Sequence, residues 1–223
     1  MVLKLYSFPK SPNVTRIAVL LHEKKVPYDF VLVNTVEGEH KTPAYLAKHP
    51  FGQIPYMDDD GFILYESWAI ARYICEKYRD QGPDLLPTDL QKRALFEQAA
   101  SVEQTNFQPH AQAIVHEGFV KELVYKQEPN KARLEEAKKI LEAKLDVYEI
   151  ILSKHKYLAG DEITLADLIH LGWGAHLSRA GFNALKDTVK RPNVAWWFNE
   201  LESRPSWQAV KDGVRSYAGQ DSV

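Results

Sequence analysis

Residues 51–67 read FGQIPYMDDDGFILYES, and this stretch decides the fold of the first half of the chain. Two short apolar runs flank an acidic turn that ends in Gly61, which is the pattern of two strands joined as a hairpin. A proline held in cis at the mouth of a strand leaves the preceding N–H and C=O groups turned outward and unpaired. The pattern predicts a cis bond between Ile54 and Pro55, beside which an extended peptide can bind as an added strand.

A helix is expected to begin at Glu66 and Ser67, directly after the second strand. The free N–H groups and the positive end of the dipole at a helix start attract a carboxylate. Taken singly, Pro55 is typical of an edge strand and Ser67 of an ordinary helix N-cap. Because both features occur within one short stretch, we favour a site for a peptide with a carboxylate over these local interpretations.

The first eighty residues alternate between strand and helix patterns. The expected elements are strands at 3–7 and 28–33, the hairpin at 54–65, and helices at 12–24, 43–48 and 66–78. A β-α-β unit followed by a hairpin and a helix is the thioredoxin-like arrangement. We therefore expect a thioredoxin-like domain over residues 1–80 and a linker over residues 81–88, where two prolines and a glycine interrupt the pattern.

The rest of the chain, residues 89–223, shows helical periodicity only and is expected to form an all-helical domain, so the fold class is α/β followed by all-α. Its expected helices are at 89–116, 131–155, 192–203 and 205–213. Thr164 and Asp167 match a capping box, so we interpret Asp167 as a local folding device and not as a catalytic group. The aromatic residues expected in the core are Trp196, Trp197, Phe198 and Trp207.

The composition is that of a globular protein, with 45% hydrophobic residues among 223 and a formal net charge of −2. No basic block is long enough to bind a nucleic-acid backbone. The N-terminus lacks a signal-peptide pattern and no apolar run approaches the roughly 18 residues of a membrane span, so the cytosol is the expected compartment. The chain has one cysteine, Cys75, and scattered histidines, so we expect no disulfide and no metal site, with Cys75 as a buried apolar residue.

The segment between the first strand and the first helix reads KSPNV, residues 10–14. Thioredoxin-like redox proteins carry Cys-Pro-x-Cys here, but Ser11 and Val14 occupy the cysteine positions, which excludes disulfide exchange by the protein's own thiols. The Ser11 hydroxyl can instead donate to a substrate thiolate. A cysteinyl thiol has a pKa near 8.5, so lowering it by about two units makes it mostly thiolate at neutral pH. These residues alone support equally the alternative that Ser11 is a simple N-cap.

Taken together, the motifs resemble those of a cytosolic glutathione transferase, most closely one of the phi class, and the resemblance covers the whole chain. The residues that carry it are Ser11 ahead of Arg16, the run Gly38 to Lys41, the run Pro50 to Pro55, Glu66-Ser67 followed by Ala69 to Ile74, and the segment from Ala159 to Asp167. The resemblance implies a glutathione S-transferase that uses glutathione as a co-substrate, without a tightly bound cofactor or a metal.

The resemblance also implies roles for individual residues. Ser11 would activate the glutathione sulfur. The glutathione-binding residues would be His40, Lys41, Gln53, Ile54, Pro55, Glu66 and Ser67. Within this set, Ile54 would pair with the cysteinyl backbone, Glu66 and Ser67 would hold the γ-glutamyl group, and Lys41 would pair with the anionic glycyl end. For the His40–Lys41 pair, a solvated loop is the alternative interpretation.

A hydrophobic electrophile is the implied second substrate. Its pocket is expected to be lined by Phe8, Pro12, Asn13, Phe107, Ala111, Val115 and Phe119. Trp68 departs from the family pattern, because an arginine usually follows Glu-Ser there. Ser7 and Asn13 lie close enough to compete with Ser11, and Tyr6 resembles the tyrosine of other classes although its place inside a strand predicts a core residue.

The implied reaction is attack of the glutathione thiolate on an electrophilic carbon or on a hydroperoxide, in a two-fold homodimer. A non-catalytic carrier of hydrophobic or glutathionylated compounds is the alternative function. A structural interaction module is a further alternative. Intact Ser11, Ile54-Pro55 and Glu66-Ser67 argue against the module, because an assembly role needs none of them.

Overall fold

A four-stranded mixed sheet organises the first part of the computed structural model, which describes residues 2–219. Its strands are β1 (Leu3–Ser7), β2 (Tyr28–Leu32), β3 (Tyr56–Asp59) and β4 (Phe62–Tyr65), in the order β2-β1-β3-β4. The pairing of β1 with β2 is parallel, whereas β1 with β3 and β3 with β4 are antiparallel. The hairpin expected around Gly61 is present. Its turn uses a positive φ of +89° at Gly61, which glycine adopts without steric cost.

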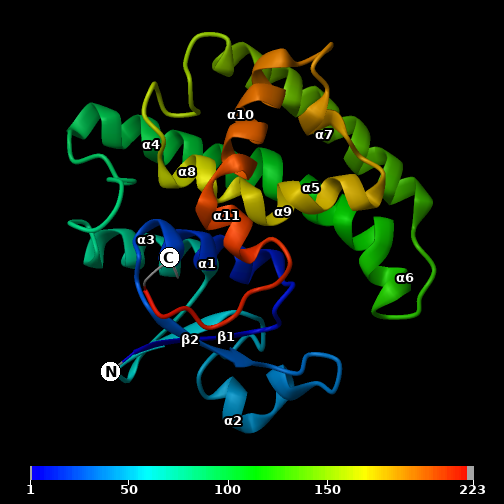
Figure 1. The fold of residues 1–223 in the computed structure, drawn as a ribbon. Helices are drawn as coiled ribbons and strands as arrows, with labels where there is room; N and C mark the ends of the chain where they lie inside the picture. Colours follow the sequence, from blue (N-terminus) through cyan, green and yellow to red (C-terminus); the bar gives the residue numbers. More distant parts are fainter. Residues whose placement is uncertain (1, 220–223) are drawn as a thin grey trace. The chain divides into compact units, whose positions relative to one another are not determined.

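Three helices and one 3-10 turn accompany the sheet: α1 (Pro12–Glu23), η1 (Glu39–Lys41), α2 (Pro43–Leu46) and α3 (Ser67–Lys77). In Figure 1, α1 and α3 lie together on one side of the sheet and α2 lies on the other. Helix α1 buries a continuous apolar stretch from Ile17 to Leu21 between the sheet and its neighbours. The thioredoxin-like order of strands and helices that the sequence predicts is therefore confirmed.

The chain divides into two compact units. The first runs to Leu86 and includes the residues from Pro205 onward; the second spans Pro87–Arg204. This differs from the expected helical domain at 89–223, because α11 (Pro205–Val210) packs against α1 of the first unit. Trp207 and Val210 are buried, and the Ser206 hydroxyl donates to the Glu23 carboxylate at 2.5 Å.

The second unit is helical throughout its regular structure. Its helices and turns are α4 (Leu90–Val102), η2 (Glu103–Phe107), α5 (Gln108–Val115), η3 (His116–Val120), α6 (Lys121–Leu123), α7 (Lys131–Leu152), α8 (Leu165–Leu168), α9 (His170–Leu177), η4 (Ser178–Ala180), η5 (Ala184–Lys186) and α10 (Pro192–Ser203). The helix expected at 89–116 extends further. Helices α4, α5 and α6 follow one another directly, joined by the π-helical turns η2 and η3. Among residues 2–219, no helix is both long and apolar enough to cross a membrane.

The core of the second unit centres on buried rings. The Tyr148 hydroxyl lies 3.1 Å from Nε2 of His170, and Nδ1 of His170 donates to the Ala166 carbonyl at 2.7 Å. Trp197 and Phe198 are buried as expected, but Trp196 is 48% exposed and faces the ammonium of Lys156, 5.7 Å from its ring centre. Consecutive side chains on a helix point in directions about 100° apart, so Trp196, Trp197 and Phe198 cannot all face the core.

Asp167 is fully buried and joins three segments of the second unit. Its carboxylate accepts from the Leu158 N–H at 2.9 Å, from the Thr164 N–H and hydroxyl at 2.9 Å each, and from the Trp197 indole at 3.0 Å. The expected capping box is present. The four donors explain why a buried carboxylate is tolerated, and they give Asp167 a structural role.

Replacing Asp167 with Ala should lower the free energy of unfolding by on the order of 3 kcal/mol, because four buried donors lose their acceptor. Urea titration followed by circular dichroism measures this loss. The control is Asp161→Ala, which removes an exposed carboxylate that accepts from the Lys156 N–H at 3.1 Å and lies 3.9 Å from the His155 ring, and which should cost less than about 1 kcal/mol. Similar losses in both variants would contradict the structural role of Asp167.

Candidate active site

The peptide bond between Ile54 and Pro55 is cis, as the sequence predicts. Ile54 precedes β3 and lies outside the strand pairing, and no hydrogen bond within residues 2–219 involves its N–H or C=O. Its side chain packs against the buried rings of Tyr45 and Tyr56. A half-buried residue thus presents one free backbone donor and one free acceptor, which is what an extended peptide needs in order to pair as an added strand.

Side chains from η1 and α2 hold the loop that leads to Ile54. The Lys41 ammonium donates to the Gly52 carbonyl at 2.6 Å and to the Phe51 carbonyl at 3.4 Å. The Tyr45 hydroxyl donates to the Gln53 carbonyl at 2.7 Å. These contacts satisfy the carbonyls of three successive residues, whereas the next carbonyl, that of Ile54, has no partner within residues 2–219.

Gly52 is required where this loop crosses η1. Its φ is +56°, and a Cβ atom at this position would lie 2.8 Å from the His40 carbonyl oxygen. A larger residue would therefore push the loop away from the turn that carries His40 and Lys41. No role was predicted from the sequence for Gly52 or Tyr45, although Gly52 stands in a tight run before a proline, which is a signal for a turn.

His40 and Lys41 lie next to this loop in η1, and Gln53 is exposed beside them. Nδ1 of His40 is buried without a hydrogen-bond partner. Burial, with the neighbouring Lys41 ammonium, lowers the pKa of His40 below its usual value, which favours the neutral ring. The Lys41 ammonium already bonds to two backbone carbonyls and remains exposed, so its pairing with an anionic glycyl end stays a prediction.

Glu66 has a left-handed backbone, with φ +70° and ψ 114°, and stands at the N-cap of α3. Non-glycine residues in this region are strained, and such strain is found mostly at functional sites. The helix itself begins at Ser67, one residue later than expected, and no side chain caps it. Ser67 is therefore the first residue of the helix and not its N-cap, so the interpretation of this serine as an ordinary helix N-cap is wrong. The start of α3 leaves N–H groups, the Ser67 hydroxyl and the exposed Glu66 carboxylate for a ligand.

Ser11 is the N-cap residue of α1, but its hydroxyl does not cap the helix. The Ser11 carbonyl accepts from the Thr15 N–H at 3.1 Å and from the Thr15 hydroxyl at 3.0 Å, and the Ser11 N–H donates to the Phe8 carbonyl at 3.0 Å. The backbone of Ser11 is thus fully used for folding. Its half-buried hydroxyl has no hydrogen bond within the described residues, so it is available as a donor at a helix N-terminus.

The residues that competed with Ser11 are placed less favourably. Ser7 has no exposed surface, so its hydroxyl cannot touch a substrate. The Tyr6 ring stacks on Tyr56 with a centroid distance of 4.4 Å and packs against the buried cluster of Val33, Tyr45 and Tyr56. Tyr6 therefore lies where the sequence predicts it, against the core, and Asn13 lies in the first turn of α1.

The residues expected to line an electrophile pocket fall into two groups. Phe8, Pro12 and Asn13 are at least partly exposed near Ser11. Phe107, Ala111 and Val115 instead belong to the core of the second unit; the Phe107 ring, for example, lies 4.6 Å from the His170 ring. Helical periodicity marks an apolar face without saying what covers it, so the place of these three buried side chains in a pocket stays a prediction.

Phe119 is half-buried, and its ring faces the Arg179 guanidinium at 4.8 Å and the His176 ring at 6.2 Å. Burial, with Arg179 nearby, lowers the pKa of His176 to about 4. This neutral histidine beside Phe119 was not predicted from the sequence. Within residues 2–219, no group of three or more His, Cys, Asp or Glu side chains is arranged to hold a metal ion.

Trp68, the departure from the family pattern, is buried in α3, and the Arg72 guanidinium lies 4.8 Å from its ring centre. A cation thus remains next to the helix start, one turn further along α3 and held by the indole face. The tryptophan fills space in the first unit, and Arg72 supplies the positive charge.

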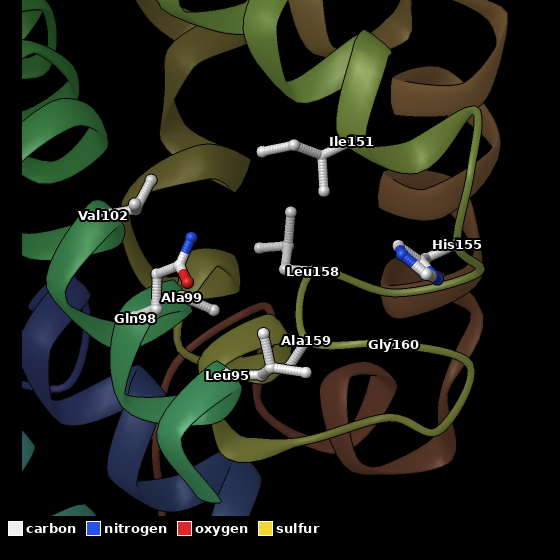
Figure 2. A pocket seen from close by; sticks show the side chains of 9 residues that line it. All are labelled: Leu95, Gln98, Ala99, Val102, Ile151, His155, Leu158, Ala159 and Gly160. Atoms are coloured by element: carbon white, nitrogen blue, oxygen red, sulfur yellow. The ribbon is translucent and has the colours of Figure 1, made fainter. Parts of the chain in front are cut away.

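A separate apolar hollow of about 200 Å³ lies within the second unit, between α4, the end of α7 and the loop that follows (Figure 2). Its lining residues are Leu95, Gln98, Ala99, Val102, Ile151, His155, Leu158, Ala159 and Gly160. Only Gln98 and His155 carry polar side chains in this lining, and none of the nine residues is a serine, cysteine or carboxylate. The hollow is suited to apolar contact and not to nucleophilic chemistry.

Both halves of the chain match known protein families. Residues 1–76 match the glutathione S-transferase N-terminal domain, and residues 107–205 match the glutathione S-transferase C-terminal domain. Glutathione S-transferase F13 of Arabidopsis thaliana is 40% identical over 96% of this chain and 97% of its own length. Glutathione S-transferase 3 of Zea mays is 42% identical over 92% of this chain and 91% of its own length.

Solved structures agree with the sequence relatives. The crystal structure of glutathione transferase F7 from Populus trichocarpa has a TM-score of 0.89 and 37% identity, covering 95% of this chain and 98% of that one. Glutathione S-transferase I from mais, solved in complex with an atrazine glutathione conjugate, has a TM-score of 0.86 and 32% identity, with coverages of 95% and 97%. The chain therefore belongs to the glutathione S-transferase family, with the phi-class enzymes as its relatives.

Proposed function

We propose that Ser11 stabilises the thiolate of bound glutathione, while Ile54, Glu66 and Ser67 hold the tripeptide. Glutathione transferase activity itself follows from the family and its curated relatives. The observation that carries the proposal is the Ser11 hydroxyl, which does not cap α1 and makes no hydrogen bond with any residue from 2 to 219. A hydroxyl donor and a helix N-terminus both favour the anion over the thiol.

The reaction proceeds in two steps. The glutathione sulfur loses its proton to solvent, and the Ser11 hydroxyl donates a hydrogen bond to the thiolate. The sulfur electron pair then forms the bond to an electrophilic carbon, and the leaving group departs with the electrons of the broken bond. Catalysis rests on stabilising the anion and on positioning it, and it needs no covalent enzyme intermediate. A hydroperoxide is the second electrophile class of the proposal. The thiolate attacks its terminal oxygen, the O–O bond breaks, the alkoxide leaves and takes a proton from solvent, and a second glutathione converts the resulting sulfenic acid into glutathione disulfide and water.

Glutathione is the proposed co-substrate, and a structural relative solved with an atrazine glutathione conjugate supports this choice. The free backbone of Ile54 would pair with the cysteinyl residue, as in a short β-ladder. The start of α3 would receive the γ-glutamyl end, and His40, Lys41 and Gln53 would face the glycyl end. The carrier alternative is not favoured, because the curated relatives are named as transferases. A cytosolic location remains a prediction of the sequence.

A homodimer is also part of the proposal. The support for it is the apolar hollow that Leu95 lines, together with the exposed apolar side chains of Val147 and Ile150 on α7. A second copy of the chain would cover this part of the second unit. A closed two-fold arrangement is the commonest way for one chain to do so.

Replacing Ser67 or Glu66 with Ala should weaken glutathione binding by about 1.5–3 kcal/mol, because each removes a hydrogen bond or a charge at the start of α3. Isothermal calorimetry measures the affinity. Ser101→Ala, an exposed serine of α4, serves as the control and should bind as the parent does. Parental affinity in both site variants would remove the γ-glutamyl end from this helix start.

Ser11→Ala should leave glutathione affinity nearly unchanged, raise the pKa of the bound thiol and lower turnover of an aromatic halide by roughly 10²-fold, as loss of one preorganised donor does. Ultraviolet titration of the bound thiolate and steady-state kinetics are the measurements. Ser11→Thr keeps a hydroxyl and is the matched control. A full rate with an unshifted thiol pKa in Ser11→Ala would rule out Ser11 as the activating group.

Ser11→Cys tests the same position from the opposite direction. A thiol at a helix N-terminus has a lowered pKa and can form a mixed disulfide with glutathione. Conjugation should fall while thiol-transfer activity appears, both measured on the same preparation. Absence of thiol transfer together with unchanged conjugation would show that residue 11 does not face the glutathione sulfur.

Leu95→Glu should convert the dimer to monomer, because Leu95 is 50% exposed at the hollow and a buried unpaired carboxylate at an interface is costly. Sedimentation velocity gives the mass in solution. The control is Ala132→Glu, an exposed position at the opposite end of α7, which should remain dimeric. A monomeric parent protein, or a dimeric Leu95→Glu, would contradict the proposed contact surface.

A further inference from the structure

The end of the chain returns to the loop that carries Ser11. After α11, Gly213 turns the backbone with φ +133°, and the Val214 N–H donates to the Pro9 carbonyl at 3.0 Å. Val214 is buried. Some two hundred residues separate the two partners in sequence, so this contact exists only because α11 packs on α1. Pro9 precedes Ser11 by two positions, inside the turn that the Ser11 N–H closes onto Phe8.

The same segment is then fixed along the edge of the sheet. The Phe30 N–H donates to the Ser216 hydroxyl oxygen at 2.8 Å, and the backbones of Tyr28 and Tyr217 exchange two hydrogen bonds of 2.9 Å. The Tyr217 ring stacks on His22 of α1 with a centroid distance of 3.9 Å. Residues 213–217, named here the C-terminal strap, therefore run from the Ser11 loop to β2, as the red end of the ribbon shows in Figure 1.

We propose that the C-terminal strap positions Ser11 for thiolate stabilisation, with Val214 as the positioning residue. The inference rests on the proposed function, in which Ser11 is the donor. Within residues 8–11, one local hydrogen bond closes the turn; Thr15 of α1 holds the Ser11 carbonyl, and the Val214 N–H holds the Pro9 carbonyl from the far end of the chain. The position of Pro9 determines the start of α1 and the direction of the Ser11 hydroxyl. A hydrogen bond to a developing charge is sensitive to displacements of about 1 Å, so this restraint matters for chemistry.

The strap contacts the Ser11 loop, and the residues proposed to hold the tripeptide, namely Ile54, Glu66 and Ser67, make none of the hydrogen bonds of residues 213–217. A strap that merely stabilised the fold would change all properties of the enzyme together. A strap that positions Ser11 separates them: turnover and the thiol pKa change, while glutathione affinity is kept.

The test is Val214→Pro, which removes the N–H donor and keeps an apolar side chain. Turnover should fall roughly tenfold, a part of the loss expected for removing the donor itself, and the pKa of bound glutathione should rise. Glutathione affinity by calorimetry should stay within about twofold. Ser216→Ala is the matched control, because it cuts the strap's bond to Phe30 and leaves the bond to Pro9.

Two further variants keep the proposal falsifiable. Gly213→Ala strains the turn at φ +133° although a Cβ there meets no atom closer than 3.8 Å, so it displaces the strap without crowding and should shift the thiol pKa in the same direction. If Val214→Pro does not fold, Gly213→Ala decides alone. The double variant Ser11→Ala with Val214→Pro should show no higher thiol pKa than Ser11→Ala by itself, because the strap acts through the hydroxyl.

The outcomes separate the two proposals. An unshifted thiol pKa in Ser11→Ala overturns the proposed function. A shift in Ser11→Ala with none in Val214→Pro overturns the role of the strap alone. A shift in Ser216→Ala as large as that in Val214→Pro, or additive shifts in the double variant, also overturns it, because either result would show a general effect on the fold.

Discussion

Two side-chain hydrogen bonds, from Lys41 to the Gly52 carbonyl and from Tyr45 to the Gln53 carbonyl, determine the shape of the candidate site. They satisfy backbone carbonyls of the loop that leads to the cis bond, whereas neither the N–H nor the C=O of Ile54 has a partner within residues 2–219. Backbone groups are among the strongest hydrogen-bonding groups of a protein, and an unpaired pair at a half-buried position is costly unless something binds there. Water or a peptide ligand can satisfy it, and a peptide offers the matching spacing.

Two helix starts complete the site from the same unit. Neither α1 nor α3 is capped by a side chain, although each begins at a serine or beside one. A side-chain cap stabilises a folded protein by about 1 kcal/mol, so the fold forgoes about this much stabilisation at each of the two helix starts. At α3 the strained backbone of Glu66 adds to that cost. A ligand with a carboxylate at one end and a thiolate near its middle would supply the missing negative charge at both starts.

Buried polar groups are prominent in the interior of the second unit. Its interior contains buried polar groups that make several hydrogen bonds, such as Asp167 with its four donors and the Tyr148–His170–Ala166 chain. Arg191, also fully buried, is held by the carboxylates of Glu142 and Asp146. Networks of this kind specify one arrangement of helices, because any other packing leaves a buried charge unpaired. Several apolar side chains of this unit nevertheless stay exposed, among them Leu95, Val147 and Ile150.

The sequence by itself determined the features that depend on neighbours along the chain. These were the order of strands and helices, the hairpin around Gly61, the cis bond before Pro55, the capping box at Thr164, and the candidate roles of Ser11, Glu66 and Ser67. Only the tertiary structure decided which apolar faces are covered, so Phe107 proved to be core and Trp196 to be exposed. It also decided the partners of Lys41 and brought Val214 to Pro9. The physical reason is that periodicity and turn chemistry act over a few residues, whereas burial and long-range hydrogen bonds depend on segments that meet only after folding.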